Sequence, residues 1–491
     1  MPIWMHAPPS VSRRRILAAG GVAPLAAALG PGRAAAQGET FTPEVLRGEL
    51  SALYETLKAS HFNLFARTPR ARYDQTYRAL LRQLDSPLSK FETERAFQRF
   101  MAAGRVAHAR IDYLLPAFRA FRAGGGRAFP LEVRIRDGRI FVVQDASGRL
   151  PPGVELMRVV GLRAASLIER LSREVSADTA YMAESLIELD FAALVWAAFG
   201  ERPVFDVTVE GRRLDLPALT KAEAAEAPQP SRLSIDPTER VARMLEGGIA
   251  YLRPGIFLNL EAGGDPYDTA PFRGFVDKGF ETFRAAGARA LLIDLRDNPG
   301  GHNAFSDHMA AWFATRPFRF YSRFDVRASI EAVRANAARL TQGEPGREIS
   351  QTLADAYARA RYPGDVVTLD AAPVPPRTGA RFTRPVFVLI NRRAYSNSVA
   401  TAALIQDYGF GHIIGEETSD LATTFGAMEQ FTLPATKIVV GYPKAFIVRP
   451  SGDLRPRGVV PSTRIATPIL EAADDPVLRS ALSMIAGAAA T

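Results

Sequence analysis

Hydrophobic residues at 386–390 form a clear structural pattern in the second half of the chain. Val, Phe, Val, Leu and Ile follow one another there without a polar residue, and the polar turn 391–395 comes directly after them. A short apolar run rich in β-branched residues predicts a strand that is buried on both faces. The apolar residues beyond the turn recur at helical spacing and predict a helix, which Ser396 or Ser398 can cap.

The junction between this turn and the helix places a serine beside backbone N–H groups. The N-terminus of a helix stabilises negative charge, so an oxyanion formed next to the hydroxyl of Ser396 or Ser398 would be stabilised there. Helix capping is the commoner role of such serines. The stretch alone therefore leaves two interpretations open, a helix cap and a catalytic nucleophile.

A second strand with the same pattern is predicted at 289–295, and it also runs into a tight turn. The turn contains Gly300 and Gly301, and an amphipathic helix is predicted over 304–315. Glycine lets the backbone approach a ligand closely and leaves an N–H free to bind it. The chain thus has two predicted strand–turn–helix units with backbone donors available at their turns.

The remaining patterns indicate a multi-domain protein of the α/β class. Apolar residues recur at helical spacing from 42 to 104, a hairpin is predicted at 129–143, and further strands at 412–415 and 437–440 are expected to complete the α/β sheet. We predict the following division: a signal peptide at 1–36, a helical domain at 40–107, a β-rich module at 128–175, a connector of helix and strand at 176–218, an Ala-, Glu- and Pro-rich linker at 219–232, and an α/β core at 233–491.

Composition narrows the classes of function. The chain has 491 residues, no cysteine and a net charge of +9. Residues 1–36 contain four arginines and no acidic residue, so they supply +4 of this charge. The remaining +5 is spread out and forms no Lys/Arg block with interleaved aromatics, which argues against nucleic-acid binding. The absence of cysteine excludes thiol catalysis, cysteine metal sites and disulfides.

The N-terminus predicts export. Ser12-Arg13-Arg14-Arg15-Ile16-Leu17 fits the twin-arginine pattern, an Ala-, Gly- and Leu-rich run follows at 18–29, and the small residues 34–36 fit a cleavage site. The alternative is an uncleaved anchor, but this run is short and contains two glycines and a proline. We expect a periplasmic or secreted protein with no stable membrane insertion after cleavage.

Several short motifs in sequence order carry a resemblance to a known family. They are Asp294-Leu-Arg-Asp-Asn-Pro-Gly-Gly301, then Val388-Leu-Ile-Asn391, Leu404-Ile-Gln-Asp-Tyr-Gly409 and Ile414-Gly-Glu-Glu-Thr418. Together they resemble the tail-specific (C-terminal-processing) serine peptidases and the related tricorn protease core. The resemblance implies a protease core of the ClpP/crotonase-like type, a peptide or protein substrate, acyl-enzyme chemistry, and no cofactor or metal.

The resemblance also implies roles for individual residues. An ungapped alignment of the motifs places Ser396, rather than Ser398, on the nucleophile, and it places Leu421 where the tail-specific group has its catalytic lysine. A Ser–Lys dyad is therefore not expected. His108 lies where tricorn-like relatives hold a histidine, and a neutral imidazole is a suitable general base. His302 is the alternative base, or a residue that contacts the substrate.

The oxyanion hole is expected to use the N–H of Gly300 or Gly301 together with that of Asn397. Two positions depart from the tricorn pattern, because Arg455 stands where the orienting glutamate is expected and Ala107 stands where a serine precedes the histidine. The third catalytic member is left unassigned among three candidates: Glu416, Glu417 and Glu429.

Two further alternatives follow from the sequence. The β-rich module at 128–175 resembles a PDZ-like module in part, and a plain β-hairpin cap on the core explains the same pattern. The departures from the family leave open a catalytically inactive periplasmic peptide-binding protein on a protease scaffold.

Overall fold

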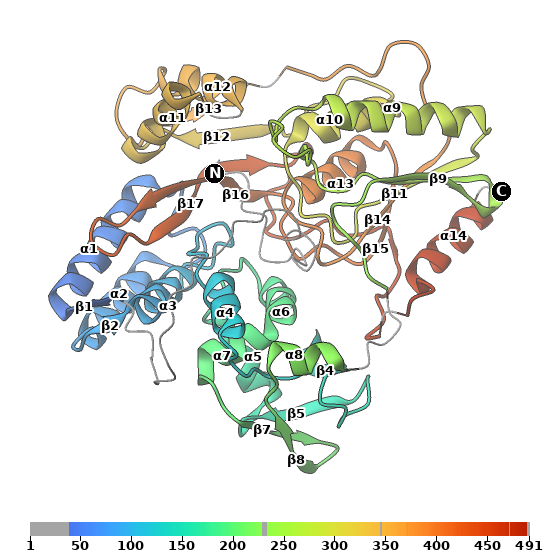
Figure 1. Cartoon of the computed structure of the whole chain (residues 1–491). Helices are drawn as coiled ribbons and strands as arrows, with labels where there is room; N and C mark the ends of the chain where they lie inside the picture. Colours follow the sequence, from blue (N-terminus) through green and yellow to red (C-terminus); the bar gives the residue numbers. More distant parts are fainter. Residues whose placement is uncertain (1–38, 228–232, 344–345, 371, 471, 489–491) are drawn as a thin grey trace.

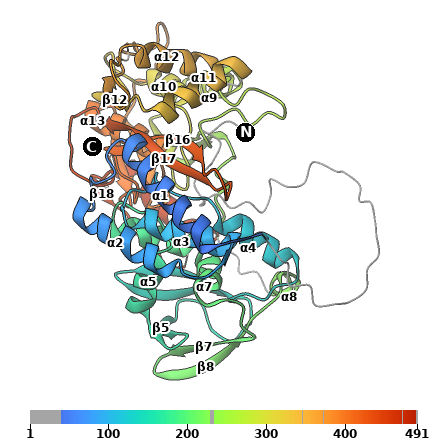
Figure 2. The ribbon, with the colours of Figure 1, turned by 90° about the vertical axis from the view of Figure 1, so that its left-hand side faces the viewer.

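The computed structural model describes residues 39–227, 233–343, 346–370, 372–470 and 472–488. The predicted signal peptide at 1–36 lies outside these residues. Within them, no helix combines the length and the apolar character needed to cross a bilayer. Figures 1 and 2 show the β-rich module at one end of the molecule and the helices of an insert at the other, with two sheets between them.

The core contains a six-stranded sheet in the order β18-β15-β14-β11-β10-β9, in which only β9 runs antiparallel to its neighbour. Its strands are β9 (Val241–Leu245), β10 (Ile249–Arg253), β11 (Ala290–Asp294), β14 (Val386–Ile390), β15 (His412–Gly415) and β18 (Thr463–Arg464). A short 3-10 turn, η2 (Glu246–Gly248), joins β9 to β10. This arrangement confirms the α/β fold class.

Helices cover both faces of this sheet because successive residues of each strand point to opposite sides. The helices α9 (Ala270–Ala285), α10 (Asn303–Ala311) and α13 (Asn397–Tyr408) share one apolar cluster with Leu291 and Ile293. On the other face α14 (Pro476–Ala488) packs against Leu292 and Leu389. The near-continuous apolar character of β11 and β14 in the sequence thus has a direct cause, since both strands are buried on two sides.

A second sheet is antiparallel and has the order β13-β12-β17-β16. It contains β12 (Arg323–Arg327), β13 (Val366–Thr368), β16 (Thr424–Thr432) and β17 (Val439–Val448), and the insert helices α11 (Ile330–Gln342) and α12 (Arg347–Tyr357) pack on it. The expectation that a strand at 437–440 completes the α/β sheet is therefore wrong. Residues 439–440 open β17, whose hydrogen-bonded partners are β16 and β12.

The N-terminal helical region covers the other side of this second sheet. It contains β1 (Thr40–Phe41), α1 (Pro43–Ser60), α2 (Arg70–Gln83), β2 (Leu88–Ser89), α3 (Lys90–Ala102) and α4 (Leu114–Ala123). Leu46, Leu50 and Leu53 are fully buried and belong to one apolar cluster with Val440 and Tyr442 of β17. The helical region is consequently docked on the core, next to the strands that follow the serine motif (Figure 1).

The β-rich module combines the segments predicted as module and connector. Its strands are β3 (Leu131–Arg136), β4 (Arg139–Asp145), β5 (Glu155–Val159), β6 (Leu162–Arg163), β7 (Val204–Val209) and β8 (Arg212–Pro217), and its helices are α5 (Ala164–Ser172), α6 (Ala180–Leu189) and α7 (Phe191–Phe199). Strand β7 pairs with β5, so both segments build one sheet, with β3 and β8 at its edges. A helix, α8 (Lys221–Glu226), lies within the predicted linker.

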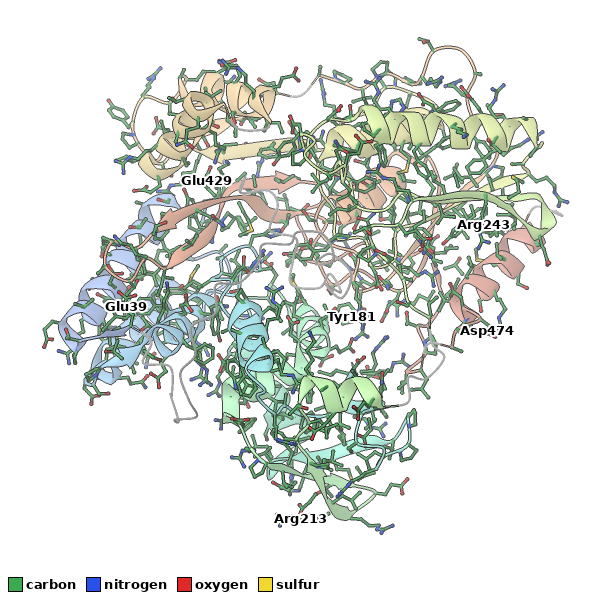
Figure 3. All side chains as sticks on the ribbon, in the orientation of Figure 1. Glu39, Tyr181, Arg213, Arg243, Glu429 and Asp474 are labelled. Atoms are coloured by element: carbon green, nitrogen blue, oxygen red, sulfur yellow. The ribbon has the colours of Figure 1, made fainter. Side chains whose placement is uncertain are left out.

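A buried ionic cluster holds the insert on the second sheet. Glu429 of β16 is fully buried and binds Arg339 of α11 at 2.8 Å and Lys444 of β17 at 2.9 Å. The charge of Lys444 is thereby balanced inside the protein, although burial lowers the pKa of its ammonium group. Figure 3 marks Glu429 between the insert and β17.

His61 is a buried histidine at the end of α1 and carries a prediction about acid stability. Its side chain is 1% exposed, and its Nδ1 accepts the N–H of Asn63 at 3.1 Å. Burial, and to a lesser extent the charge of Arg327, lowers the pKa of His61 to about 3. In the unfolded chain the pKa is about 6.5, so the unfolded state alone binds this proton between those two values.

The contribution of neutral His61 to the free energy of unfolding should therefore be complete above pH 6.5. It should fall as the pH decreases below that value, by up to about 1.4 kcal/mol per pH unit. We expect His61→Gln to lose stability less steeply than the wild type between pH 6.5 and 4 in urea unfolding titrations. Equal slopes for the two proteins would contradict the buried, neutral state of His61.

Candidate active site

The two strand–turn–helix units of the sequence meet at one edge of the parallel sheet. Strands β11 and β14 are parallel neighbours, so the turns that follow them lie side by side. Gly300 has a φ of +92°, and a Cβ built on it would lie 2.6 Å from the backbone nitrogen of Asn397 and 2.9 Å from Cβ of Ser396. Only glycine fits this position, and its close approach forms the centre of the candidate site.

Ser396 has an unusual backbone for a residue with a side chain. Its φ is +53° and its ψ is −122°, and it precedes the first residue of α13 without making a side-chain cap to that helix. A non-glycine residue in such a region costs about 1–3 kcal/mol and persists only where its surroundings enforce it. The side chain is partly exposed, as a nucleophile must be.

Ser398 has a different role. It is fully buried, its hydroxyl lies 2.8 Å from the carbonyl of Asn298 and 2.9 Å from that of Tyr395, and it accepts the N–H of Tyr395 at 2.9 Å. These bonds fix the turn between β14 and α13. The geometry therefore separates the two serines that the sequence left as alternatives, and it leaves only Ser396 available to a substrate.

The backbone donors around Ser396 are not equivalent. The N–H of Gly300 donates to Oδ1 of Asn298 at 2.8 Å, and the N–H of Ser396 donates to Oδ2 of Asp420 at 2.6 Å. Both groups are thus occupied. Among the hydrogen bonds of the described residues, the N–H groups of Gly301 and Asn397 have no acceptor. Of the expected oxyanion donors, Gly301 and Asn397 thus keep an N–H without an acceptor among the described residues, whereas that of Gly300 serves the turn.

His108 reaches the site from the N-terminal region. The loop that carries it is pinned to the second sheet, because Arg110 and Gly441 of β17 exchange two backbone hydrogen bonds of 3.0 and 2.9 Å. The ring of His108 lies 5.4 Å from the ring of Tyr395, measured between centroids. The predicted base therefore packs against the residue that directly precedes the predicted nucleophile.

The environment keeps His108 neutral. Burial first, then the charge of Arg110, lowers its pKa to about 3, while a hydrogen bond to the backbone of Phe425 acts in the opposite direction. The side chain is 6% exposed, and its Nδ1 is buried without a hydrogen-bond partner. At neutral pH the imidazole is therefore in the form that accepts a proton.

The alternative base, His302, serves as a helix cap. Its Nδ1 accepts the N–H of Ala304 at 3.3 Å at the start of α10, and its ring lies edge-on to Tyr267 with centroids 5.8 Å apart. Burial lowers its pKa to about 4. These contacts give His302 a structural role.

The three acids considered as third member are engaged elsewhere. Glu416 binds Arg392 at 2.9 Å and accepts the hydroxyl of Tyr181, which Figure 3 labels on α6, at 3.1 Å. Glu417 lies 3.3 Å from Arg457, and Glu429 belongs to the ionic cluster of the insert. None of these contacts involves Ser396 itself, although Arg392 belongs to the turn that precedes it.

The positions that depart from the family pattern have other roles. Arg455 is exposed and binds Asp453 at 2.6 Å. Leu421, at the position of the catalytic lysine, is 2% exposed. Two lysines that could be considered in its place are engaged in other contacts. Lys444 is held by Glu429 at 2.9 Å, and Lys437 is exposed and donates to the carbonyl of Pro434 at 2.6 Å.

Sequence reasoning missed two buried acids beside the site. Asp420 accepts the N–H of Ser396, and Asp178, two residues before α6, accepts the N–H of Ala107 at 3.0 Å. Asp420 adjoins Leu421, so the departure at the lysine position was a possible signal for it. Asp178 lies far from both motifs in the sequence, and nothing near it indicates a partner at residue 107.

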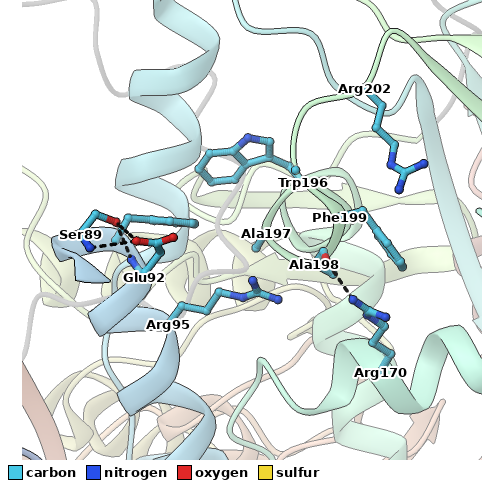
Figure 4. A pocket seen from close by; sticks show the side chains of 11 residues that line it. Ser89, Glu92, Arg95, Arg170, Trp196, Ala197, Ala198, Phe199 and Arg202 are labelled. Atoms are coloured by element: carbon cyan, nitrogen blue, oxygen red, sulfur yellow. Dashed lines mark hydrogen bonds between the residues drawn. The ribbon is translucent and has the colours of Figure 1, made fainter. Parts of the chain in front are cut away.

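A separate cavity of about 610 Å³ lies away from these residues. Its wall combines side chains of α3 with those of α5 and α7, including Arg95, Arg170, Trp196 and Phe199 (Figure 4). Arg170 lies over the ring of Phe199 and donates to the carbonyl of Ala198 at 3.0 Å. None of the candidate catalytic residues lines this cavity, which belongs to the boundary between the helical region and the β-rich module.

Comparisons with known proteins agree with this geometry. Residues 267–465 match the model of Peptidase family S41. The structure is similar to that of mature CPAF, with a TM-score of 0.60 and 17% sequence identity over 90% of this chain and 96% of that chain. Mature CPAF complexed with lactacystin gives a TM-score of 0.60 at 16% identity, over 90% and 98% of the two chains.

A cpaf s499a mutant gives a TM-score of 0.58 at 16% identity, over 86% of this chain and 93% of that chain. No curated protein sequence matches the chain. At these identities the structural neighbours establish the fold, while the family match covers the segment that contains both glycines and Ser396. The resemblance inferred from the motifs is thus confirmed, and the chain is a serine-type peptidase whose core at 267–465 belongs to peptidase family S41.

Proposed function

We propose that this chain is an exported peptidase that cleaves peptide bonds through an acyl-enzyme on Ser396, with His108 as the general base. One observation carries the proposal: Ser396 occupies a positive-φ turn at the start of α13, in contact with the glycine turn, and the ring of His108 packs against the preceding residue, Tyr395. Export is supported by the twin-arginine pattern at 12–17 and the cleavage-site pattern at 34–36.

The residues divide the reaction between them. Oγ of Ser396 attacks the carbonyl carbon of the substrate while its proton passes to the imidazole of His108, and the carbonyl oxygen becomes an oxyanion. The N–H groups of Gly301 and Asn397 bind that oxyanion, each stabilising it by about 3 kcal/mol. The imidazolium then gives the proton to the departing amine, and the C–N bond breaks. Water, activated by the same imidazole, releases the second product.

The nucleophile can be tested with a fluorophosphonate probe on the mature protein. We expect labelling of the wild type and none of Ser396→Ala, because the phosphorus attaches to the serine oxygen. Ser398→Ala is the matched control: it should remain labelled but lose about 1 kcal/mol of stability, since it removes a buried hydroxyl that binds the carbonyl of Asn298.

Labelling that persists in Ser396→Ala would contradict the assignment of the nucleophile. Absence of labelling in the folded wild type would favour the inactive peptide-binding protein. Lactacystin, which one structure of mature CPAF contains, provides an independent competitor: if the sites are chemically alike, preincubation should reduce labelling of Ser396.

The base is tested by His108→Ala. Loss of a positioned general base should lower the rate of acylation by about two to four powers of ten. His302→Ala should acylate at nearly the wild-type rate and lose about 1 kcal/mol of stability, because it removes a helix cap. Lys437→Ala, on the surface, should change neither quantity. If His108→Ala acylates at the wild-type rate and His302→Ala does not, His302 rather than His108 is the general base.

Recognition of a free C-terminus is the further part of the proposed function. The module at 128–175 has an edge strand, β3, to which an extended peptide could add as a further strand beyond Ile135, whose N–H and C=O are already bound by Glu188 and Arg392. We expect Ser396→Ala protein to bind peptides with a free C-terminal carboxylate more tightly than the same peptides amidated, measured by fluorescence anisotropy. Equal affinities would make the module a structural cap.

A further inference from the structure

Two of the three positions that depart from the family pattern, Leu421 and Ala107, share an unexpected feature. Leu421 stands at the lysine position, and its N–H donates to Oδ1 of Asp420 at 2.9 Å. Ala107 stands where a serine precedes the histidine, and its N–H donates to Oδ2 of Asp178 at 3.0 Å. A buried carboxyl group therefore binds the backbone at each departure, and neither acid belongs to the motifs that identified the family.

Asp420 binds the nucleophile turn directly. Its side chain is fully buried, and its Oδ2 accepts the N–H of Ser396 at 2.6 Å while Oδ1 holds Leu421. A hydrogen bond contributes about 0.5–1.5 kcal/mol when both groups are neutral and about 1.5–3 kcal/mol when one is charged. These ranges overlap the cost of the positive φ at Ser396. Asp420 thus supplies an interaction of the size needed to keep the serine in its strained conformation.

Asp178 binds the loop of the base. It is 5% exposed, and besides the N–H of Ala107 it accepts Nε of Arg67 at 3.3 Å. Ser176 adds to this anchoring, because its hydroxyl donates to the carbonyl of Ala109 at 2.6 Å. The residues on both sides of His108 are therefore held by the segment that leads into α6.

The two carboxyl groups also interact with each other. Burial raises the pKa of Asp420 to about 7, its hydrogen bond to Ser396 opposes this, and the charge of Asp178 raises it further. The ring of Tyr395 lies in the field of both acids, which raise the pKa of its phenol together with burial, while Arg110 lowers it. One buried region thus contains Tyr395, both carboxyl groups and the guanidinium of Arg110.

From these contacts we infer that Asp420 and Asp178 are paired positioning residues, which hold the serine turn and the histidine loop in the geometry that proton transfer requires. The inference rests on the proposed function, because it assigns these acids to the same site. Neither carboxyl group contacts a reacting atom. Their effect passes through the backbone of Ser396 and of Ala107, so a change in either acid should displace a catalytic side chain without removing it.

Two substitutions of each acid separate positioning from simple folding. Asp420→Ala and Asp178→Ala remove the acceptor, whereas Asp420→Asn and Asp178→Asn retain one carbonyl oxygen that can accept the same N–H. A displacement of about 1 Å in an active site costs about 10²-fold in rate. We therefore expect the second-order rate constant for fluorophosphonate labelling to fall by about 10²-fold in each alanine variant and to recover by about tenfold in each asparagine variant.

A matched control is available in the same core. Asp307 on α10 is also a buried acid, 8% exposed and bonded to Asn303, but it does not bind the turn of Ser396. Asp307→Asn should label like the wild type. Melting temperatures of all variants show which of them are folded, and the asparagine variants keep the test valid if an alanine variant fails to fold.

Hydrogen exchange measured by mass spectrometry gives a readout that does not depend on activity. In Asp420→Ala, amides at 395–399 should exchange faster than in the wild type while those of α14 remain unchanged, and in Asp178→Ala the same should hold at 106–110. If the wild type fails to label but exchange changes as described, the proposed function fails and the positioning role stands. The inference would be overturned if folded Asp420→Ala and Asp178→Ala label and exchange like the wild type. It would also be overturned if the alanine and asparagine variants label equally slowly at unchanged melting temperatures.

Discussion

The close contact between the glycine turn and the serine turn is the constraint on which the rest of the site depends. It arises because β11 and β14 are parallel neighbours, with Asp294 opposite Leu389 near their carboxyl ends. At Gly300 a single methyl group would collide with the backbone of Asn397, and at Gly301 it would collide with the carbonyl of Phe257. The missing side chain of Gly300 therefore lets the glycine turn touch the serine turn, and that of Gly301 lets the same turn pack against Phe257. The buried strands fix the positions of the two turns, and the turns position Ser396 and the backbone groups near it.

The parts of this arrangement that depend on local pattern were predictable. The strand at 386–390, the turn and the following helix have the predicted order, because a run of buried β-branched residues and a wide apolar helix face leave few other solutions. The same holds for the glycine turn. Ser396 was distinguished from Ser398 by the family motifs, and the structure adds the physical reason, which is that the hydroxyl of Ser398 is committed to the turn.

Long-range pairing accounts for what could not be predicted. The pattern at 437–440 indicated a strand correctly but could not tell which sheet it joins, and β7 could not be seen to pair with β5 across the intervening helices. The acids that bind the catalytic turns, Asp420 and Asp178, were missed for the same reason. Their function depends on partners brought close by tertiary structure, and a buried aspartate has no periodicity that reveals its partner.

The pinning of the His108 loop to β17 means that the proposed catalytic unit extends beyond the segment that matches the family. A fragment of residues 267–465 would contain Ser396 and both glycines but neither His108 nor Asp178. It would also expose the apolar face of β17, where Val440 and Tyr442 are fully buried beneath the helical region. With His108 as the proposed base, the N-terminal region contributes to the chemistry as well as to the fold, and the bridge from Arg110 to Gly441 is the backbone contact that joins the two.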